Sequence, residues 1–191
     1  MAATRPTHLH FTGDDEADRL LADEPLALLI GFVLDQQVLV QKAFSGPLEL
    51  RRRLGILDAT AIAALDPARL EEAFREKPAL HRYPGAMSRR VQDLCATIAE
   101  EYGGRAERVW LEAESGEELE RRLLALPGIG PMKARSLLAI LGKRFGVRPT
   151  GWNHVAPSHP TLGDVDSPEA LEAYQAWKRD YKASQRSARA T

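Results

Sequence analysis

Cysteine is nearly absent from this sequence, which has Cys95 and no other thiol among 191 residues. A single cysteine excludes a disulfide within the chain, and five scattered histidines add no ligand set, so we expect no structural metal. Cys95 has apolar neighbours at helical spacing, which indicates a small buried hydrophobic side chain.

Long apolar runs are missing as well. The longest one, residues 25–34, is too short to cross a membrane and stops at Asp35. The first residues also lack the apolar core of a secretion signal. We therefore expect a cytoplasmic protein that has no membrane partner.

The chain has no large excess of either charge, because 26 basic and 27 acidic residues give a formal net charge of −1. The distribution is uneven: residues 13–24 are acidic, whereas residues 133–148 and 178–189 are basic. Such segregation fits one basic surface facing nucleic acid and an acidic face turned away from it. It fits equally well a solvated acidic face with a basic tail.

Strand alternation is absent too, and helical patterns cover most of the chain. The sequence predicts a single all-α domain at residues 15–182, after a disordered or extended tail at 1–14 and before a basic disordered tail at 183–191. One long apolar helix is expected from Pro25 to about Phe44, ended by residues 45–47.

The most informative segment is residues 117–141, which predicts two helices joined by a very tight hairpin, with a capping-box pattern at Ser115 to Glu118. Gly128 and Gly130 are expected to adopt positive φ, and Pro131 suits the first position of the second helix. Free amides at the bend, followed by the basic stretch, predict a phosphate site. A glycine corner that binds nothing is the simpler alternative.

The run Leu126-Pro127-Gly128-Ile129-Gly130, followed by Lys133-Ala134, resembles the helix-hairpin-helix of base-excision DNA glycosylases, the helix-hairpin-helix–GPD superfamily. Two other segments match in the same order: residues 26–44 with Leu34-Asp35-Gln36-Gln37-Val38, and residues 81–104 with Tyr83, Gly85 and Arg89-Arg90. The resemblance spans about residues 26–155. It implies a helical barrel-like lobe and a small second lobe formed by the N- and C-terminal segments.

The resemblance implies a monomeric, nucleoid-associated DNA repair protein that binds double-stranded DNA, flips a damaged or deaminated base and hydrolyses its N-glycosidic bond. No cofactor is implied, because one cysteine cannot hold the four-cysteine iron–sulfur cluster of some relatives. The expected DNA contacts are Gln36, Gln37, Gly128, Ile129, Gly130, Met132, Lys133 and Arg135. Gln37 matches a glutamine that fills the gap left in the duplex.

Three aromatic residues, Phe32, Tyr83 and Trp152, are candidates for stacking on the flipped base. Phe32 and Trp152 also fit a purely structural role, in the core and between the lobes. Met132 stands where bifunctional relatives have a Schiff-base lysine, so the resemblance implies a monofunctional enzyme. Lys133 lies about 100° further round the helix and is expected to contact phosphate.

The sequence departs from the family at the catalytic carboxylate. Asn153 stands in the place of the family's aspartate, beyond the second hairpin helix. Asp35, an acid of the loop (Asp164 or Asp166), or His154 acting on water could replace it. Asp35 is favoured because it interrupts an apolar helix, where burial should raise its pKa.

Both loop acids also fit a loop and a helix cap. The missing aspartate equally fits a catalytically silent protein that binds damaged DNA, or an architectural DNA-binding protein.

Overall fold

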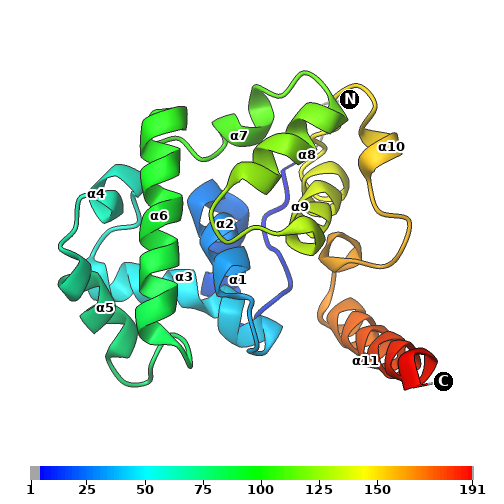
Figure 1. The fold of residues 1–191 in the computed structure, drawn as a ribbon, viewed down its shortest axis with the longest axis horizontal. Coiled ribbons are helices and arrows are strands. Elements are labelled where there is room, and N and C mark those ends of the chain that lie inside the picture. Colours follow the sequence, from blue (N-terminus) through cyan, green and yellow to red (C-terminus); the bar gives the residue numbers. More distant parts are fainter. Residues whose placement is uncertain (1–4, 191) are drawn as a thin grey trace.

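The computed structural model describes residues 5–190, with side chains through residue 185. Its regular structure is helical, and no strand occurs within this range (Figure 1). The elements are α1 (Asp15–Asp23), α2 (Pro25–Leu34), α3 (Val40–Leu54), α4 (Ala59–Ala63), α5 (Pro67–Arg75), α6 (Pro84–Tyr102), α7 (Arg108–Leu111), α8 (Gly116–Ala125), α9 (Pro131–Lys143), α10 (Trp152–Val155), the 3-10 helix η1 (Leu162–Asp164) and α11 (Pro168–Ala190). The prediction of an all-α chain is confirmed.

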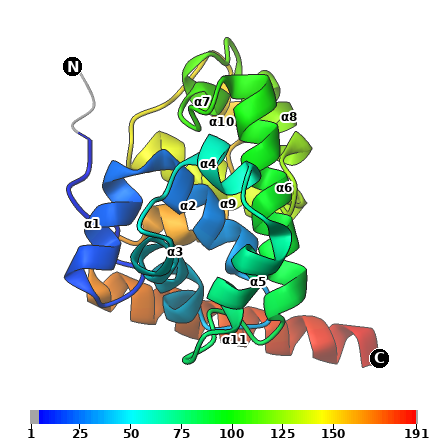
Figure 2. The same ribbon diagram turned by 90° about the vertical axis from the view of Figure 1, so that its left-hand side faces the viewer.

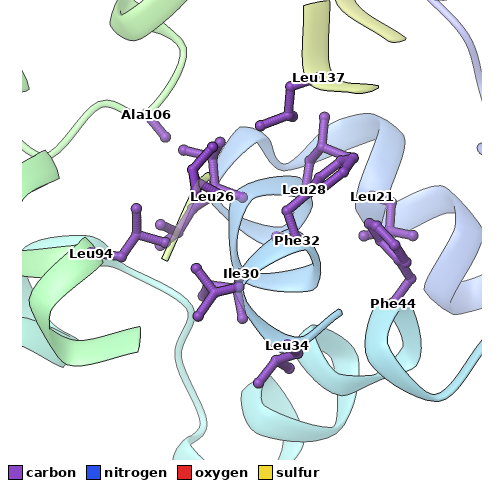
Figure 3. Close-up of a cluster of buried hydrophobic side chains, with 14 of the residues drawn as sticks. Leu21, Leu26, Leu28, Ile30, Phe32, Leu34, Phe44, Leu94, Ala106 and Leu137 are labelled. Atoms are coloured by element: carbon purple, nitrogen blue, oxygen red, sulfur yellow. The ribbon is translucent and has the colours of Figure 1, made fainter. Parts of the chain in front are cut away.

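Helix α2 forms the centre of the core because it is apolar around its whole circumference. Every residue from Leu26 to Leu34 is buried. Figure 3 shows its side chains pointing outward in several directions, toward Leu94 of α6, Leu137 of α9 and Phe44 of α3. Helices α1, α3, α6 and α9 therefore pack around α2. This packing holds the C-terminal end of α2 in place.

The expected long helix from Pro25 to Phe44 is in fact two helices. Helix α2 ends at Leu34, and α3 begins at Val40. Gln37 between them has a φ of 56°, a left-handed conformation that interrupts a right-handed helix. Pro47 does not end α3, because buried Phe44 and Leu48 on either side of it hold the helix in place across the proline.

The N-terminal segment is not a free tail. Residues 5–14 contain no helix, but Leu9 and Phe11 are fully buried. The Phe11 ring meets Phe44 edge-on, with 5.2 Å between centroids, and the Asp18 carboxylate accepts hydrogen bonds from the N–H groups of Phe11 and Thr12 at 3.0 Å each. The segment is thus part of the core; the expected tail at residues 1–4 lies outside the described residues.

The C-terminal segment also differs from the expectation. Helix α11 continues through Ala190, where a disordered tail was expected from residue 183. Residues 183–190 contain alanine, glutamine and arginine, which favour helix, and no glycine or proline. In both views α11 runs along one side of the molecule, and its C-terminal end extends beyond the other helices (Figures 1 and 2). Residue 191 is outside the described range.

Candidate nucleic-acid interface

The hairpin between α8 and α9 lies where the sequence predicts it, and the outer helix bounds, at residues 116 and 143, differ by one or two residues from the expected 117 and 141. Helix α8 ends at Ala125 and α9 begins at Pro131, so five residues make the connection. The Ser115 hydroxyl accepts a hydrogen bond from the N–H of Glu118 at 3.1 Å. The Glu118 carboxylate accepts from Glu114 instead of Ser115, so the capping box is incomplete. The two helices are nevertheless fixed at the positions expected.

The two hairpin glycines have different conformations. Gly128 has a φ of 82°, as expected, and a Cβ there would lie 3.1 Å from the Val33 side chain. Gly130 has a φ of −89° and a ψ of 179°, so the expected positive φ is wrong. Its extended backbone follows from Pro131, whose ring disfavours other conformations in the preceding residue. Only Gly128 therefore needs to be glycine for the turn itself.

The bend exposes main-chain amides. The N–H groups of Gly128, Gly130 and Met132 have no hydrogen-bond partner among residues 5–190. Both glycines are exposed, and the Met132 side chain is 78% exposed. Because these amides stand at the positive end of the α9 dipole, they are suited to an anion.

Ile129 does not share this exposure. Its N–H donates to the carbonyl of Leu126 at 3.1 Å, and its side chain is buried in the core. The expectation that Ile129 contacts DNA is therefore wrong for both its side chain and its amide. The residue anchors the bend from within, because an apolar side chain at this point secures the turn to the core.

Lys133 is turned inward. Its ammonium donates to the carbonyl of Val33 at 3.4 Å and to that of Gly128 at 3.2 Å. Burial lowers the pKa of this half-buried amine, and the nearby Asp35 carboxylate acts in the opposite direction. The expected phosphate contact is not what the structure favours, because the carbonyls at the C-terminal end of α2 attract the cation. Lys133 instead ties the hairpin to α2.

The basic stretch after the hairpin does not form one surface. Lys143 pairs with Asp164, while Arg148 donates to the carbonyl of Gly142 at 2.8 Å and lies over the Trp152 ring. These contacts are at the end of α9 opposite the hairpin, about 18 Å away at 1.5 Å per residue. Arg135 is exposed in the second turn of α9, and no ion pair holds it within the described side chains. It remains available to a ligand at the hairpin.

The turn from Asp35 to Leu39 lies beside the hairpin through Lys133. Gln37 is exposed, and its Oε1 accepts a hydrogen bond from the Tyr83 hydroxyl at 3.2 Å. Gln36 accepts from Arg90 of α6. Leu39 is 73% exposed, an unusual position for a large apolar side chain. The turn therefore presents both a glutamine and a leucine to solvent.

His81, which the sequence did not single out, holds this turn against the start of α6. Its Nδ1 accepts from the N–H of Tyr83 at 3.0 Å, so the proton is on Nε2, which donates to the carbonyl of Gln36 at 3.0 Å. Burial lowers the pKa of His81, and these bonds suit the neutral ring. The feature of the sequence that could have indicated this role is the position of His81 at the start of the segment 81–104.

Asp35 lies where α2 ends and α11 passes. Burial raises the pKa of its carboxyl, as expected, while Lys178, Lys133 and Lys182 act in the opposite direction. Burial also raises the pKa of Tyr174 to about 12, and the negative charge of Asp35 contributes. The lysines and tyrosine of α11 were not expected here, because nothing in the local sequence connects residue 35 with residues 174–182.

For two of the three base-pocket candidates, the structure agrees with the structural alternative. Phe32 is buried and packs edge-on to Phe44 at 5.1 Å between centroids. Trp152 is buried too: its Nε1 donates to the carbonyl of Leu138 at 3.0 Å, and its ring fills the space beside Gly142. Of the three aromatic residues only Tyr83, 41% exposed, reaches the surface. The rings of Phe32 and Trp152 are packed in the core, where the neighbouring residues leave room for them.

A hollow of about 410 Å³ lies at the opposite end of α2 from Asp35. Its lining includes Pro25, Leu28, Trp110 and Phe145, and Asp35 is not among them. This hollow is therefore no substitute for the expected base pocket.

Asn153 and His154 do not join Asp35. Both are exposed on α10, which packs against Gly116 at the start of α8 and Gly142 at the end of α9. These positions mark the end of the helix pair opposite the hairpin. Asn153 and His154 are separated from Asp35 because the loop that leads to α10 starts at the C-terminal end of α9, which lies opposite the hairpin.

The loop acids have structural partners or lie at the surface. The Asp164 carboxylate accepts from the N–H and hydroxyl of Thr161 and pairs with Lys143, which agrees with the capping alternative. Asp166 is exposed. Asp35 is the candidate carboxylate that the structure brings beside the hairpin.

Comparison of the chain with protein-family models, curated proteins and solved structures finds no match. Within residues 5–190 no group of three or more histidine, cysteine, aspartate or glutamate side chains is arranged to hold a metal ion. None of the helices described is long and apolar enough to cross a membrane.

Proposed function

We propose that this protein is a DNA repair protein, a monofunctional glycosylase that binds duplex DNA at the hairpin and hydrolyses the N-glycosidic bond of a damaged or deaminated base. One observation carries the proposal: Lys133 joins the exposed hairpin to the end of α2, just before Asp35 and Gln37. Free amides, an exposed glutamine and a half-buried carboxylate thereby share one surface.

In this proposal the amides of Gly128, Gly130 and Met132 bind a phosphate of the DNA strand, and Arg135 contributes a cation. Gln37 enters the space that the flipped base vacates. Leu39 and Met132, both largely exposed, press against the neighbouring bases, as apolar wedges do in proteins that unstack DNA. Unstacking costs about a few kcal/mol and is cheapest at a damaged or mismatched base, which gives the protein its selectivity.

Asp35 is the proposed catalytic residue. Cleavage of the glycosidic bond builds positive charge on the sugar, and an ionised carboxylate stabilises that charge while water attacks. Lys133, Lys178 and Lys182 favour the ionised form of Asp35 against the effect of burial. Met132 stands at the position where bifunctional relatives have a Schiff-base lysine, so we propose hydrolysis without strand cleavage.

The helix-hairpin-helix–GPD fold is part of the same proposal. The all-helical chain and the hairpin bounds support it, as do the three matching segments, which meet at one surface: residues 26–44, 81–104 and the hairpin. The division into a barrel-like lobe and a smaller second lobe belongs to this proposal, as do the monomeric state and the association with the nucleoid.

A catalytically silent protein that binds damaged DNA is the second candidate. Two observations favour it: Asn153 stands at the place of the family's aspartate, and Phe32 and Trp152 are buried in the core instead of forming a base pocket. Such a protein would use the same hairpin and Gln37 and would release no base.

The test is a panel of duplexes carrying uracil, hypoxanthine, alkylated purines, oxidised purines or an abasic site. We expect strand breaks at one class of lesion after alkali treatment, and none without alkali. Asp35→Asn should abolish base release, whereas Asp93→Asn, which removes an exposed carboxylate of α6, should leave it unchanged.

Lesion-specific binding without release in the wild-type protein would support the silent candidate. Equal binding to intact and lesion duplexes would contradict both candidates and indicate an architectural protein. Loss of release in Asp166→Asn, with release intact in Asp35→Asn, would move the chemistry to the loop before α11.

A further inference from the structure

Helix α11 carries a row of aromatic rings on one face. Tyr174, Trp177 and Tyr181 follow each other at spacings of three and four residues, which places them on the same side of a helix. Trp177 stands in the middle of the row. Its centroid is 6.2 Å from that of Tyr174 and 5.3 Å from that of Tyr181, with interplanar angles of 26° and 16°.

A fourth ring joins the row from the loop before η1. His159 stacks on Trp177 with 6.0 Å between centroids and an interplanar angle of 13°. The rings are therefore nearly parallel although they come from two segments of the chain. Such an arrangement leaves a flat ring face at the end of the row, where Tyr181 is 49% exposed.

Cations accompany the rings. The ammonium of Lys178 lies 5.7 Å from the centroid of the Tyr174 ring. Lys178, Arg179 and Lys182 form no salt bridge within the part of the chain whose side chains are described, although Asp35 lies near both lysines. Asp180 is the one acid from residue 177 onward in a stretch that also contains Arg186 and Arg189. The positive charges of Lys178, Arg179 and Lys182 are therefore available to a polyanion.

The row is also accessible. Tyr181 is 49% exposed, and the C-terminal end of α11 extends beyond the other helices in both views (Figures 1 and 2). Tyr174, at the other end of the row, is half-buried beside Asp35. The rings therefore lead from the surface proposed to act on the base to the exposed end of the helix.

We infer that the aromatic row of α11, made of His159, Tyr174, Trp177 and Tyr181, binds unpaired nucleotides of single-stranded DNA. A base stacked on the free face of Tyr181 continues the row of parallel rings, and the adjacent cations meet its phosphates. Paired bases in an intact duplex have no free face to offer, so the row selects unpaired nucleotides. This contact is separate from the hairpin contact of the proposed function.

Intrinsic fluorescence tests the inference on the full chain. Trp110 and Trp152 are only 6% and 7% exposed, whereas Trp177 is half-buried and its ring lies next to that of Tyr181, so DNA bound along the row should quench Trp177 above all. We expect a short oligothymidylate to quench the emission, and added salt to weaken the effect. The same length of intact duplex should quench less. Trp177→Phe should abolish the quenching.

Tyr181→Ala should lower the affinity for oligothymidylate about 5- to 150-fold, the range that loss of one base–aromatic stack gives. Leu111→Ala is the matched control, since it removes another exposed apolar side chain far along the chain, in α7, and should leave the affinity unchanged. Circular dichroism should show the same helix content in all variants.

Unchanged oligothymidylate affinity in Tyr181→Ala would overturn the inference, as would equal quenching by single-stranded DNA and intact duplex. Gly130→Ala separates it from the proposed function, because this change is aimed at the hairpin alone. If Gly130→Ala loses duplex binding and keeps oligothymidylate binding, the two contacts are independent. Loss of both in Gly130→Ala would also overturn the inference, because the hairpin would then bind the single strand.

Discussion

The two hairpin glycines provide a direct test of the phosphate contact, because the structure gives them different requirements. Gly128 has a φ of 82°, and a Cβ there would meet Val33 at 3.1 Å. Gly130 has an extended backbone, and a Cβ there would meet no atom within 4 Å. Alanine at Gly130 should therefore fit the fold, whereas alanine at Gly128 should strain it.

The expected effects on stability follow from these conformations. A left-handed alanine costs about 1–2 kcal/mol, so Gly128→Ala should lower the melting temperature by about 2–8 °C in a chain of this size. Gly130→Ala should keep or slightly raise it, because alanine restricts the unfolded chain by about 0.4–1 kcal/mol at a compatible position. Thermal unfolding followed by circular dichroism measures both changes.

DNA binding should show the opposite order, with Gly130→Ala weakening it more than Gly128→Ala does. A methyl group at Gly130 would meet no protein atom within 4 Å, so we expect it to take up space that a phosphate needs at the neighbouring free amides. One hydrogen bond to a charged group contributes about 1.5–3 kcal/mol, so Gly130→Ala should weaken duplex binding about 10- to 150-fold in a fluorescence anisotropy titration. Wild-type affinity in this stable variant would refute the phosphate contact. Unchanged stability of Gly128→Ala would refute the argument from its conformation.

Three further substitutions test other parts of the surface. Burial raises the pKa of Asp35 in the folded protein above its ordinary value, so ionisation of Asp35 lowers the stability of the fold as the pH rises from about 3.8 through that raised pKa. Asp35→Asn should therefore abolish base release and yet have a higher melting temperature than the wild type at pH 7. A lower melting temperature would contradict this. His81 has a lowered folded pKa, so stability should fall as the pH decreases from about 6.5 through that lowered value, and His81→Phe should lack this step in melts across pH. Trp152→Phe loses the hydrogen bond to Leu138 and should destabilise the fold by about 1–3 kcal/mol without changing lesion binding, whereas a stable variant that no longer recognises the lesion would return Trp152 to the base pocket.

The hairpin was predictable from the sequence because its signals are local. Leucines at helical spacing, a serine cap and Pro131 mark the helix bounds without any knowledge of the rest of the chain. The break after Leu34 was not predictable in the same way. Apolar residues continue on both sides of the turn, and the left-handed backbone of Gln37 is a conformation that its residue type rarely adopts.

Contacts between distant segments account for the errors in the candidate site. Lys133 looked like a phosphate ligand from its place on α9, but the carbonyls of Val33 at the end of α2 and of Gly128 attract it inward. For Trp152 the sequence left a base pocket and a packing role open, and the space beside Gly142, which accepts its ring, favours packing. Periodicity describes one helix at a time, so it cannot indicate which gap a neighbouring element leaves.

Lys133 and Asp35 link the proposed DNA contact of the hairpin to the proposed chemistry. Each charge favours ionisation of the other, while burial disfavours both. Asp35→Asn therefore removes the carboxylate and also lowers the pKa of the amine that joins the hairpin to α2. Base release and duplex affinity should accordingly be measured on the same protein. Lost release with unchanged affinity would assign the defect to chemistry, whereas a parallel loss of affinity would assign it to a loosened hairpin.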